Sequence, residues 1–253
     1  MKPAKVTLLH RMLHCLKHVD CNIVKYFTST YLLVNISLFA IILFPFSVIS
    51  AAEDEYANFE ELKNNTNPSD YGISTQERNT SVLVLAIHGG GIEGGTSELA
   101  RELSKHHSMY LFEGLMPSGN SVLHITSTHF DEPASLTMAR GHMSVISLHG
   151  YSADEKNIKV GGTDRNRAAL LVETLHKAGF PAELLSAQDK YAGVSPDNIA
   201  NKSISGLSIQ LELSMGFRKS MFETFSLKSR SSTQNQTFYK FTETISDFIN
   251  AQY

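Results

Sequence analysis

Two histidines and a glutamate follow apolar runs in this sequence, and these residue types bind zinc. His88 comes directly after the run VLVLAI, and three glycines and an isoleucine separate it from Glu93. A Gly-Gly-Gly turn permits backbone angles that other residues avoid, so it can bring His88 and Glu93 to face one point. His149 follows a second apolar run, VISL. Two imidazoles and one carboxylate form a ligand set of zinc peptidases, which keep a fourth position open for water.

A further acidic residue, Glu212, lies inside the apolar run LSIQLEL. Side chains alternate along a strand, so Gln210 and Glu212 share one face while the leucines and the isoleucine share the other. A carboxylate is costly to bury unless it has a partner or a function. Glu212 is therefore a candidate general base that takes a proton from metal-bound water.

Each of these residues has a simpler interpretation when it is taken alone. A histidine at a strand end is usually structural or exposed, a glutamate in an edge strand often faces water, and a glycine run can be a plain turn. Four such candidates at the ends of predicted strands in one sheet together favour a site. The residues by themselves indicate a His/Glu/His metal site and leave its substrate open.

The glycine run also fits other motifs, which the rest of the sequence excludes. His-Gly-Gly-Gly after a strand forms the oxyanion loop of lipases and esterases, but their Gly-x-Ser-x-Gly elbow does not occur. A phosphate-binding loop needs Gly-Lys-Ser or Gly-Lys-Thr after the glycines, and the sequence has neither. The motif His-Glu-x-x-His of helix-borne zinc sites is missing as well.

Alternating strands and helices are expected to position these residues at one edge of a sheet. Short apolar runs predict strands at Val82–Ile87, Ser108–Phe112, Val122–Thr126, Ser144–Leu148, Ala182–Leu185 and Leu207–Leu213. Helices are predicted at Ser97–His106, Glu132–Arg140, Asp164–Ala178 and Phe238–Ala251. Continuous apolar strands are buried on both faces, so we expect an α/β fold with a three-layer, open mixed sheet flanked by helices. Sites in such sheets collect at the carboxyl ends of the strands.

Several blocks of the sequence resemble the poly-γ-glutamate hydrolases of bacilli and their phages. In order, they are LAIHGGGIEGGTSELA, YLFEGLMPSGNSVLHITSTHFDEP, ISLHGY, VGGTDRN and GLSIQLELS. The resemblance implies a zinc carboxypeptidase-like fold with one catalytic Zn²⁺ ion, bound by His88, Glu93 and His149. It also implies that Glu212 is the general base in hydrolysis of the γ-glutamyl amide bonds of the polymer.

Positive side chains are expected near the site, because both the polymer and the tetrahedral intermediate are anionic. The candidates for contact with substrate are Arg165, Arg167, Arg218, His129 and Asp131. For at least two of the arginines an ordinary surface position is the simpler interpretation. The segment 120–133, which also carries His124, is expected either to form part of the site wall or to be a structural loop.

Two other functions remain open on the same scaffold. One is a different zinc amidase, such as a carboxypeptidase or a peptidoglycan peptidase. An exopeptidase of this kind would need an arginine that binds a terminal carboxylate. The other is a catalytically inactive binding protein, against which the intact set of four candidate residues argues.

The first 52 residues have the composition of a signal peptide or an N-terminal anchor. Basic residues precede an apolar run at 31–49, and the small residues Ser50, Ala51 and Ala52 then offer a cleavage site. Both cysteines, Cys15 and Cys21, fall in this segment. We therefore expect a secreted protein that contacts the membrane only if the segment is retained.

Residues 53–80 are polar and rich in turn formers, which predicts a flexible lead-in to a zinc hydrolase domain at 81–253. The chain has 22 basic and 25 acidic residues, and removing the first 52 leaves 17 basic and 24 acidic, a net charge of −7. An acidic surface is unsuited to nucleic acid. We expect a monomer whose partner is the anionic polymer and not nucleic acid.

Overall fold

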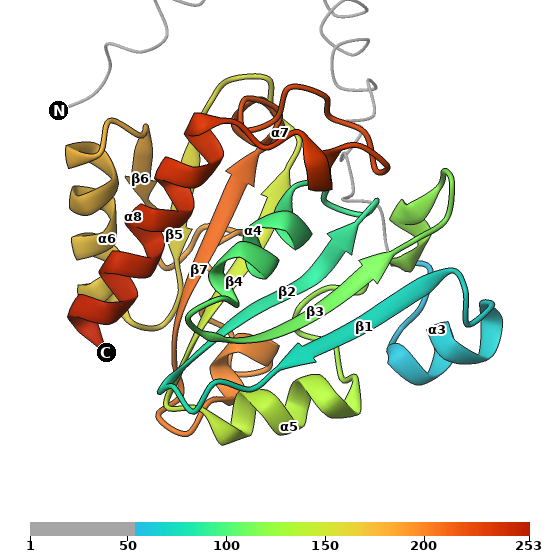
Figure 1. Cartoon of the computed structure of the whole chain (residues 1–253). Coiled ribbons are helices and arrows are strands. Elements are labelled where there is room, and N and C mark those ends of the chain that lie inside the picture. Colours follow the sequence, from blue (N-terminus) through green and yellow to red (C-terminus); the bar gives the residue numbers. More distant parts are fainter. Residues whose placement is uncertain (1–53) are drawn as a thin grey trace, which may run out of the picture. The chain divides into compact units, whose positions relative to one another are not determined.

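The computed structural model describes residues 54–253, so the predicted signal peptide or anchor at 1–52 lies outside the described residues. A seven-stranded sheet, in the order β1-β3-β2-β4-β7-β5-β6, forms the centre (Figure 1). The strands are β1 (Tyr71–Gln76), β2 (Val82–Gly90), β3 (Ser108–Gly114), β4 (Ser144–Tyr151), β5 (Ile158–Gly161), β6 (Ala182–Leu184) and β7 (Leu207–Ser214). None of the helices in residues 54–253 combines the length and apolar character that a membrane span requires.

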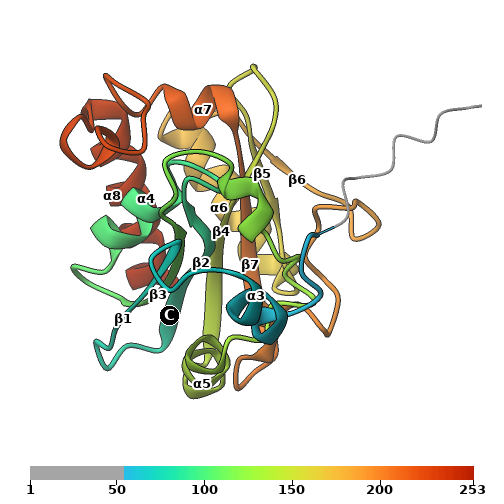
Figure 2. The same cartoon turned by 90° about the vertical axis from the view of Figure 1, so that its right-hand side faces the viewer.

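Helices cover both faces of the sheet, which confirms the predicted three-layer α/β fold. They are α3 (Phe59–Asn65), α4 (Thr96–Leu103), α5 (Pro133–Gly141), α6 (Arg165–Lys177), α7 (Met215–Lys219) and α8 (Gln236–Gln252). Short 3₁₀ turns are η2 (Asn120–Leu123), η3 (Ile199–Lys202) and η4 (Arg230–Ser232). Figure 2 shows α4 and α8 on one side of the sheet and α3 on the other.

Alternation along the strands divides the apolar side chains into two core layers. On what we call the α8 face, Val84, Ile146 and Leu211 pack with Leu99 of α4 and Phe241 of α8. On what we call the α5 face, Leu85, Val145 and Phe112 pack with Leu62 of α3 and Ala139 of α5. The central strands are buried on both faces, as their continuous apolar runs predicted.

The central strands run in parallel, so their carboxyl ends meet at one edge. β2 pairs in parallel with both β3 and β4, and β4 pairs in parallel with β7. β1 and β5 are antiparallel to their neighbours β3 and β7, which makes the sheet mixed as predicted. In this register His149 of β4 lies directly beside Glu212 of β7.

Two predictions about individual segments were wrong. The lead-in is ordered from residue 54: Phe59 and Leu62 of α3 enter the core, and β1 pairs with β3 along its length. The predicted strand Val122–Thr126 is instead the end of η2 followed by extended chain. Its alternating apolar residues Leu123 and Ile125 are buried against the α5 face without joining a ladder.

Candidate metal centre

The position of His88 depends on an irregularity in β2. Ala86 lies beside Leu111 and Gly89 lies beside Glu113, so β2 contains one residue more than β3 over this stretch. Such a bulge turns the next side chain to the other face of the strand. Ile87 already packs on the α5 face, and His88 points to the same side, where its ring lies 4.0 Å from that of His124.

The glycine-rich turn then brings Glu93 back over His88. The backbone N–H of Glu93 donates to the carbonyl of His88 at 2.8 Å, which closes the turn. Gly90 has φ +63°, and a side chain there would collide with the backbone of Gly114, so this position requires glycine. Thr96, at the start of α4, donates to the Glu93 carbonyl at 3.0 Å and fixes the far end of the turn.

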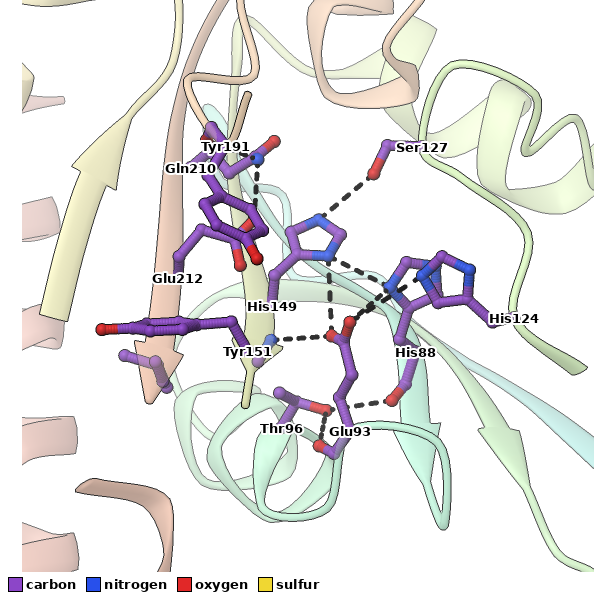
Figure 3. A network of polar contacts seen from close by, with 12 residues as sticks. His88, Glu93, Thr96, His124, Ser127, His149, Tyr151, Tyr191, Gln210 and Glu212 are labelled. Atoms are coloured by element: carbon purple, nitrogen blue, oxygen red, sulfur yellow. Dashed lines mark hydrogen bonds and ion pairs between the residues drawn. The ribbon is translucent and has the colours of Figure 1, made fainter. Parts of the chain in front are cut away.

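Three side chains converge at the carboxyl ends of β2 and β4 (Figure 3). The Nδ1 atoms of His88 and His149 are 3.2 Å apart. The Glu93 carboxylate lies 3.1 Å from Nδ1 of His88 and 3.6 Å from Nδ1 of His149. Two ligands at ordinary zinc distances on a tetrahedral ion are about 3.4 Å apart. The spacing of these three atoms therefore fits one tetrahedral ion.

Further hydrogen bonds orient two of the three candidate ligands, His88 and Glu93. Nε2 of His88 lies 2.9 Å from the carbonyl of Ile125, so this nitrogen carries the proton and Nδ1 keeps its lone pair for the centre. Glu93 accepts a hydrogen bond of 2.8 Å from the backbone N–H of Gly150. These contacts leave a carboxylate and an imidazole nitrogen directed at the same point.

Charge interactions also favour an ionised Glu93. Burial works against its charge, but when the imidazoles are protonated on both nitrogens, the positive charge of His88 and the hydrogen bonds that His149 and His88 then donate outweigh burial and lower the pKa of the carboxyl. Burial likewise works against charge on His149, yet the hydrogen bond to Glu93 and the charge of Glu212 raise the pKa of the imidazole. Glu93 is thus held in the charged form that binds a cation, whereas His149 would release its proton when a metal binds.

Glu212 occupies the next strand, on the same face as His149. Its side chain is 5% exposed, and its Oε1 accepts a hydrogen bond of 3.0 Å from Nε2 of Gln210, as their shared face predicted. Burial raises the pKa of the Glu212 carboxyl to about 7, and the charge of Glu93 adds to this effect while His149 opposes it. A carboxyl with a pKa near neutrality can both accept and release a proton.

The segment 120–133 forms one wall of the centre, but through residues other than the two that we had singled out. His124 stacks on His88, and its Nδ1 lies 2.6 Å from the carboxylate of Asp54. Ser127 lies 3.5 Å from Nε2 of His149. His129 is exposed, and Asp131 is exposed and accepts from the backbone N–H of Phe59 at 2.8 Å. The prediction that these two contact substrate gains no support, because Asp131 fixes the start of α3.

The three predicted arginines are not grouped at the site. Arg165 donates to the backbone carbonyls of Gly162 and Leu185. Arg167 pairs with Asp164 at 2.8 Å, and its guanidinium lies 4.4 Å from the centre of the Tyr253 ring. Tyr253 reaches Ser144 at the start of β4, so Arg167 lies at the opposite end of that strand from His149. Arg167 therefore lies away from the centre, and its predicted contact with substrate gains no support from its position.

Arg218 is fully buried behind the centre, where it holds backbone in place. Its guanidinium donates to the carbonyls of Leu213 at 3.0 Å, Gly94 at 2.7 Å and Tyr151 at 3.3 Å. A side chain at Gly150 would collide with this guanidinium. Arg218 therefore joins the ends of β4 and β7 to the Glu93 turn, and its charge acts on the site from behind without exposure to substrate.

A second buried arginine, which the sequence analysis did not single out, holds the same turn. Arg230 donates to the Gly90 carbonyl at 2.6 Å and pairs with Glu98 of α4 at 3.1 Å. Nothing in its local sequence distinguishes it, because it comes from η4, more than a hundred residues after the turn. The turn that carries Glu93 is thus fixed at Gly90 and at Gly94 by two separate arginines.

The sequence is similar to those of two proteins of Bacillus subtilis (strain 168). The chain is 64% identical over 253 residues, the whole of both chains, to the UPF0714 protein YndL of Bacillus subtilis (strain 168). It is 53% identical over 228 residues to the SPbeta prophage-derived UPF0714 protein YoqZ of the same strain, covering 89% of this chain and 82% of that one.

Two solved structures are similar as well. One, described as zinc-free apo YNDL, has 67% identity and a TM-score of 0.79, covering 79% of this chain and all of that one. The other is a bacteriophage poly-gamma-glutamate hydrolase with 39% identity and a TM-score of 0.75, covering 79% of this chain and 98% of that one. The model of the poly-gamma-glutamate hydrolase family matches residues 56–244. The chain therefore belongs to the poly-gamma-glutamate hydrolase family.

Proposed function

We propose that this protein hydrolyses the γ-glutamyl amide bonds of poly-γ-glutamate and that it requires one zinc ion. One observation carries the proposal: the ligand atoms of His88, Glu93 and His149 converge at tetrahedral spacing beside the buried carboxylate of Glu212. The family match and the name of the bacteriophage relative support the substrate. The description of the YNDL structure as a zinc-free form supports the choice of metal.

In this proposal the two histidines and Glu93 hold the ion, and the surrounding residues hold them. A zinc ion at such a site supplies Lewis-acid chemistry, which polarises an amide carbonyl and acidifies water. Ile125 fixes the tautomer of His88, and the N–H of Gly150 fixes the carboxylate of Glu93. Arg218 and Arg230 fix the turn, so that the ligands are ordered before substrate arrives.

Glu212 moves the proton. Its Oε1 accepts from Gln210, and among residues 54–253 no protein group donates to Oε2, which leaves that atom for the attacking water. Glu212 takes the proton from the water at Oε2 and passes it to the amine nitrogen that leaves. The raised pKa of the carboxyl suits both transfers, because the same group must accept and then release the proton.

The test is an assay on the polymer with the purified protein from residue 53 onward. We expect loss of high-molecular-weight poly-γ-glutamate on a gel, inhibition by a chelator and recovery with added zinc. Polymer that stays full length after incubation with zinc-loaded, folded protein would contradict the substrate. Chelator-resistant cleavage would contradict the zinc requirement.

We also propose that the protein acts outside the cell, since its first 52 residues have the composition of a signal peptide. Expression of the full chain in a Bacillus host should place it in the culture medium with a new N-terminus near residue 53. Recovery of the uncut chain in the membrane fraction would show that the segment is an anchor instead.

A further inference from the structure

Two lysines and two tyrosines form a cluster beside Glu212, which we call the lysine–tyrosine cluster: Tyr151, Lys159, Lys190 and Tyr191. Nζ of Lys159 lies 5.0 Å from the centre of the Tyr151 ring and 5.4 Å from that of Tyr191. Nζ of Lys190 lies 4.6 Å from the Tyr191 ring, and the two rings are 5.7 Å apart. Such contacts hold an ammonium group in place without neutralising its charge.

The cluster lies on the same face of the sheet as the metal centre. Lys159 of β5 is directly opposite Glu212 of β7, and side chains of an antiparallel pair at one register position share a face. Tyr151 is two residues beyond His149 on β4 and shares its face for the same reason. Figure 3 shows both tyrosines on the Glu212 side of the centre, away from His124.

The same hydrogen-bond network orders the cluster and the candidate base. Gln210 donates to the carbonyl of Tyr191 at 3.1 Å and to Glu212 at 3.0 Å. Asn198 in turn donates to the side-chain oxygen of Gln210 at 2.9 Å, so the orientation of this amide is fixed. The position of Tyr191 relative to Glu212 is therefore set by a buried amide.

The ammonium groups of the cluster are available to a ligand. Within residues 54–253, neither Nζ lies within 4.0 Å of a carboxylate oxygen. Glu183 of β6 is the register partner of Lys159, but its carboxylate accepts a hydrogen bond from Asn157 at 2.7 Å and forms no ion pair with Lys159. Lys159 is half-buried and Lys190 is exposed, which places one cation inside the site and one at its rim.

We propose that the lysine–tyrosine cluster binds the free α-carboxylate of the glutamyl residue whose amine leaves. This proposal rests on the proposed function, in which Glu212 passes a proton to that amine. In a γ-linked chain, the carbon attached to the scissile nitrogen carries a free carboxylate, one bond away. In an α-linked chain, the same carbon carries the chain carbonyl, and the free carboxylate lies at the end of a longer side chain. The cluster thereby recognises γ-linked glutamate by the place of its charge.

The kinetic test compares Lys159→Gln with the wild type, both zinc-loaded, on a defined γ-linked oligoglutamate. We expect KM to rise about tenfold or more, on the scale of one lost charge-assisted hydrogen bond. Lys190→Gln should have a smaller effect because it lies at the rim. Lys159→Arg should restore most of the affinity, which a purely structural role for the residue would not produce.

The matched control is Lys240→Gln. Lys240 also lies over an aromatic ring, 5.7 Å from the centre of Phe180, but it belongs to α8 on the other face of the sheet. Its KM should stay within about twofold of the wild-type value. An oligomer with its α-carboxylates converted to neutral amides should remove the difference between Lys159→Gln and the wild type. An unchanged KM for folded Lys159→Gln on the charged oligomer would overturn the proposal.

A binding experiment separates failure of the cluster from failure of the proposed function. In a Glu212→Gln background, calorimetry with the charged oligomer should show that Lys159→Gln weakens binding about tenfold and that Lys240→Gln does not. If the oligomer binds in this way but the wild type never cleaves it, the cluster stands and the hydrolase proposal falls. If the wild type cleaves it and neither KM nor Kd responds to Lys159→Gln, the cluster falls and the hydrolase proposal stands.

Discussion

The two ends of the central strands both contain charged and polar residues, but only those at the carboxyl ends form a candidate site. At the carboxyl ends, the ligand atoms of His88, Glu93 and His149 converge, and Glu212 lies beside His149 on the neighbouring strand β7. At the amino end of β4, Arg167 lies against Tyr253 and pairs with its own neighbour Asp164, an N-cap residue of α6. Charged groups at the first end are buried and lie close together, whereas Arg167 at the second end is partly exposed and paired with Asp164. Residue type therefore indicates chemistry only together with the end of the sheet that it occupies.

The largest effect is expected from a substitution at the carboxyl ends of the strands. Glu212→Gln should lower kcat on poly-γ-glutamate by roughly 10³-fold or more, because general acid–base catalysis is worth about 10²–10⁴-fold and one group performs both transfers. Bound zinc, measured by metal analysis, should stay near one per chain. Glu243→Gln, an exposed change on α8, is the matched control. Normal turnover in Glu212→Gln would show that another group moves the proton.

The next effect concerns the buried ion pair of Arg230 and Glu98 behind the Glu93 turn. Arg230→Met leaves Glu98 buried without its partner, and breaking such a pair costs about 3–5 kcal/mol. Chemical denaturation should show this loss in the free energy of unfolding. Arg101→Met, which removes a half-exposed arginine from its pair with Glu113, should cost less than about 1 kcal/mol. Equal losses in the two variants would mean that the buried pair of Arg230 and Glu98 adds no more to the free energy of unfolding than a partly exposed pair does.

Metal removal should produce a moderate effect on stability. A ligand that binds only the folded state stabilises it by about 2.7 kcal/mol at a hundred times its Kd, so chelation should lower Tm measurably. His149→Gln should have a Tm that no longer responds to zinc, because one of three ligands is lost. His106→Gln, at an exposed position after α4, should respond as the wild type does. A zinc-dependent Tm shift retained in His149→Gln would remove that residue from the ligand set.

The smallest effect is expected from a substitution at the amino end of β4. Arg167→Gln removes an ion pair and a ring contact that are partly exposed, so the free energy of unfolding should fall by only about 1 kcal/mol. Both kcat and KM on the polymer should stay within about twofold of wild type. A large rise in KM would return Arg167 to the substrate-binding residues.

The fold class was predictable because buried parallel strands leave continuous apolar runs. VLVLAI and VISL became the centres of β2 and β4, and Asp164 caps α6 close to where the sequence placed that helix. β1 was missed because YGISTQ is a partly exposed edge strand with polar residues. β5 was missed because it has four residues and ends in glycine. The alternation of Leu123 and Ile125 imitated a strand because burial alone can produce it.

The site was predictable where a strand end fixes a residue and not where the tertiary fold does. His88 and His149 follow recognisable strands, so their proximity could be inferred before the structure. The roles assigned to these residues remain predictions. Lys159 lies in the missed strand β5, and Arg230 comes from a distant turn, so no local pattern marked either. The positions of the arginines could not be inferred, because composition does not say at which end of a strand a charge will lie.

The extra residue in β2 decides on which face of the sheet the His88 side chain lies. Without the extra residue, the imidazole of His88 would point towards α4, into an apolar layer, and Glu93 would keep only the nitrogens of His149 and Gly150 as neighbours. The number of residues in β2 before the glycines therefore determines whether His88 can face Glu93 and His149, even when all three residues are present. A relative that keeps every histidine and glutamate of the set but lacks a single residue before the glycines is therefore expected not to assemble the centre.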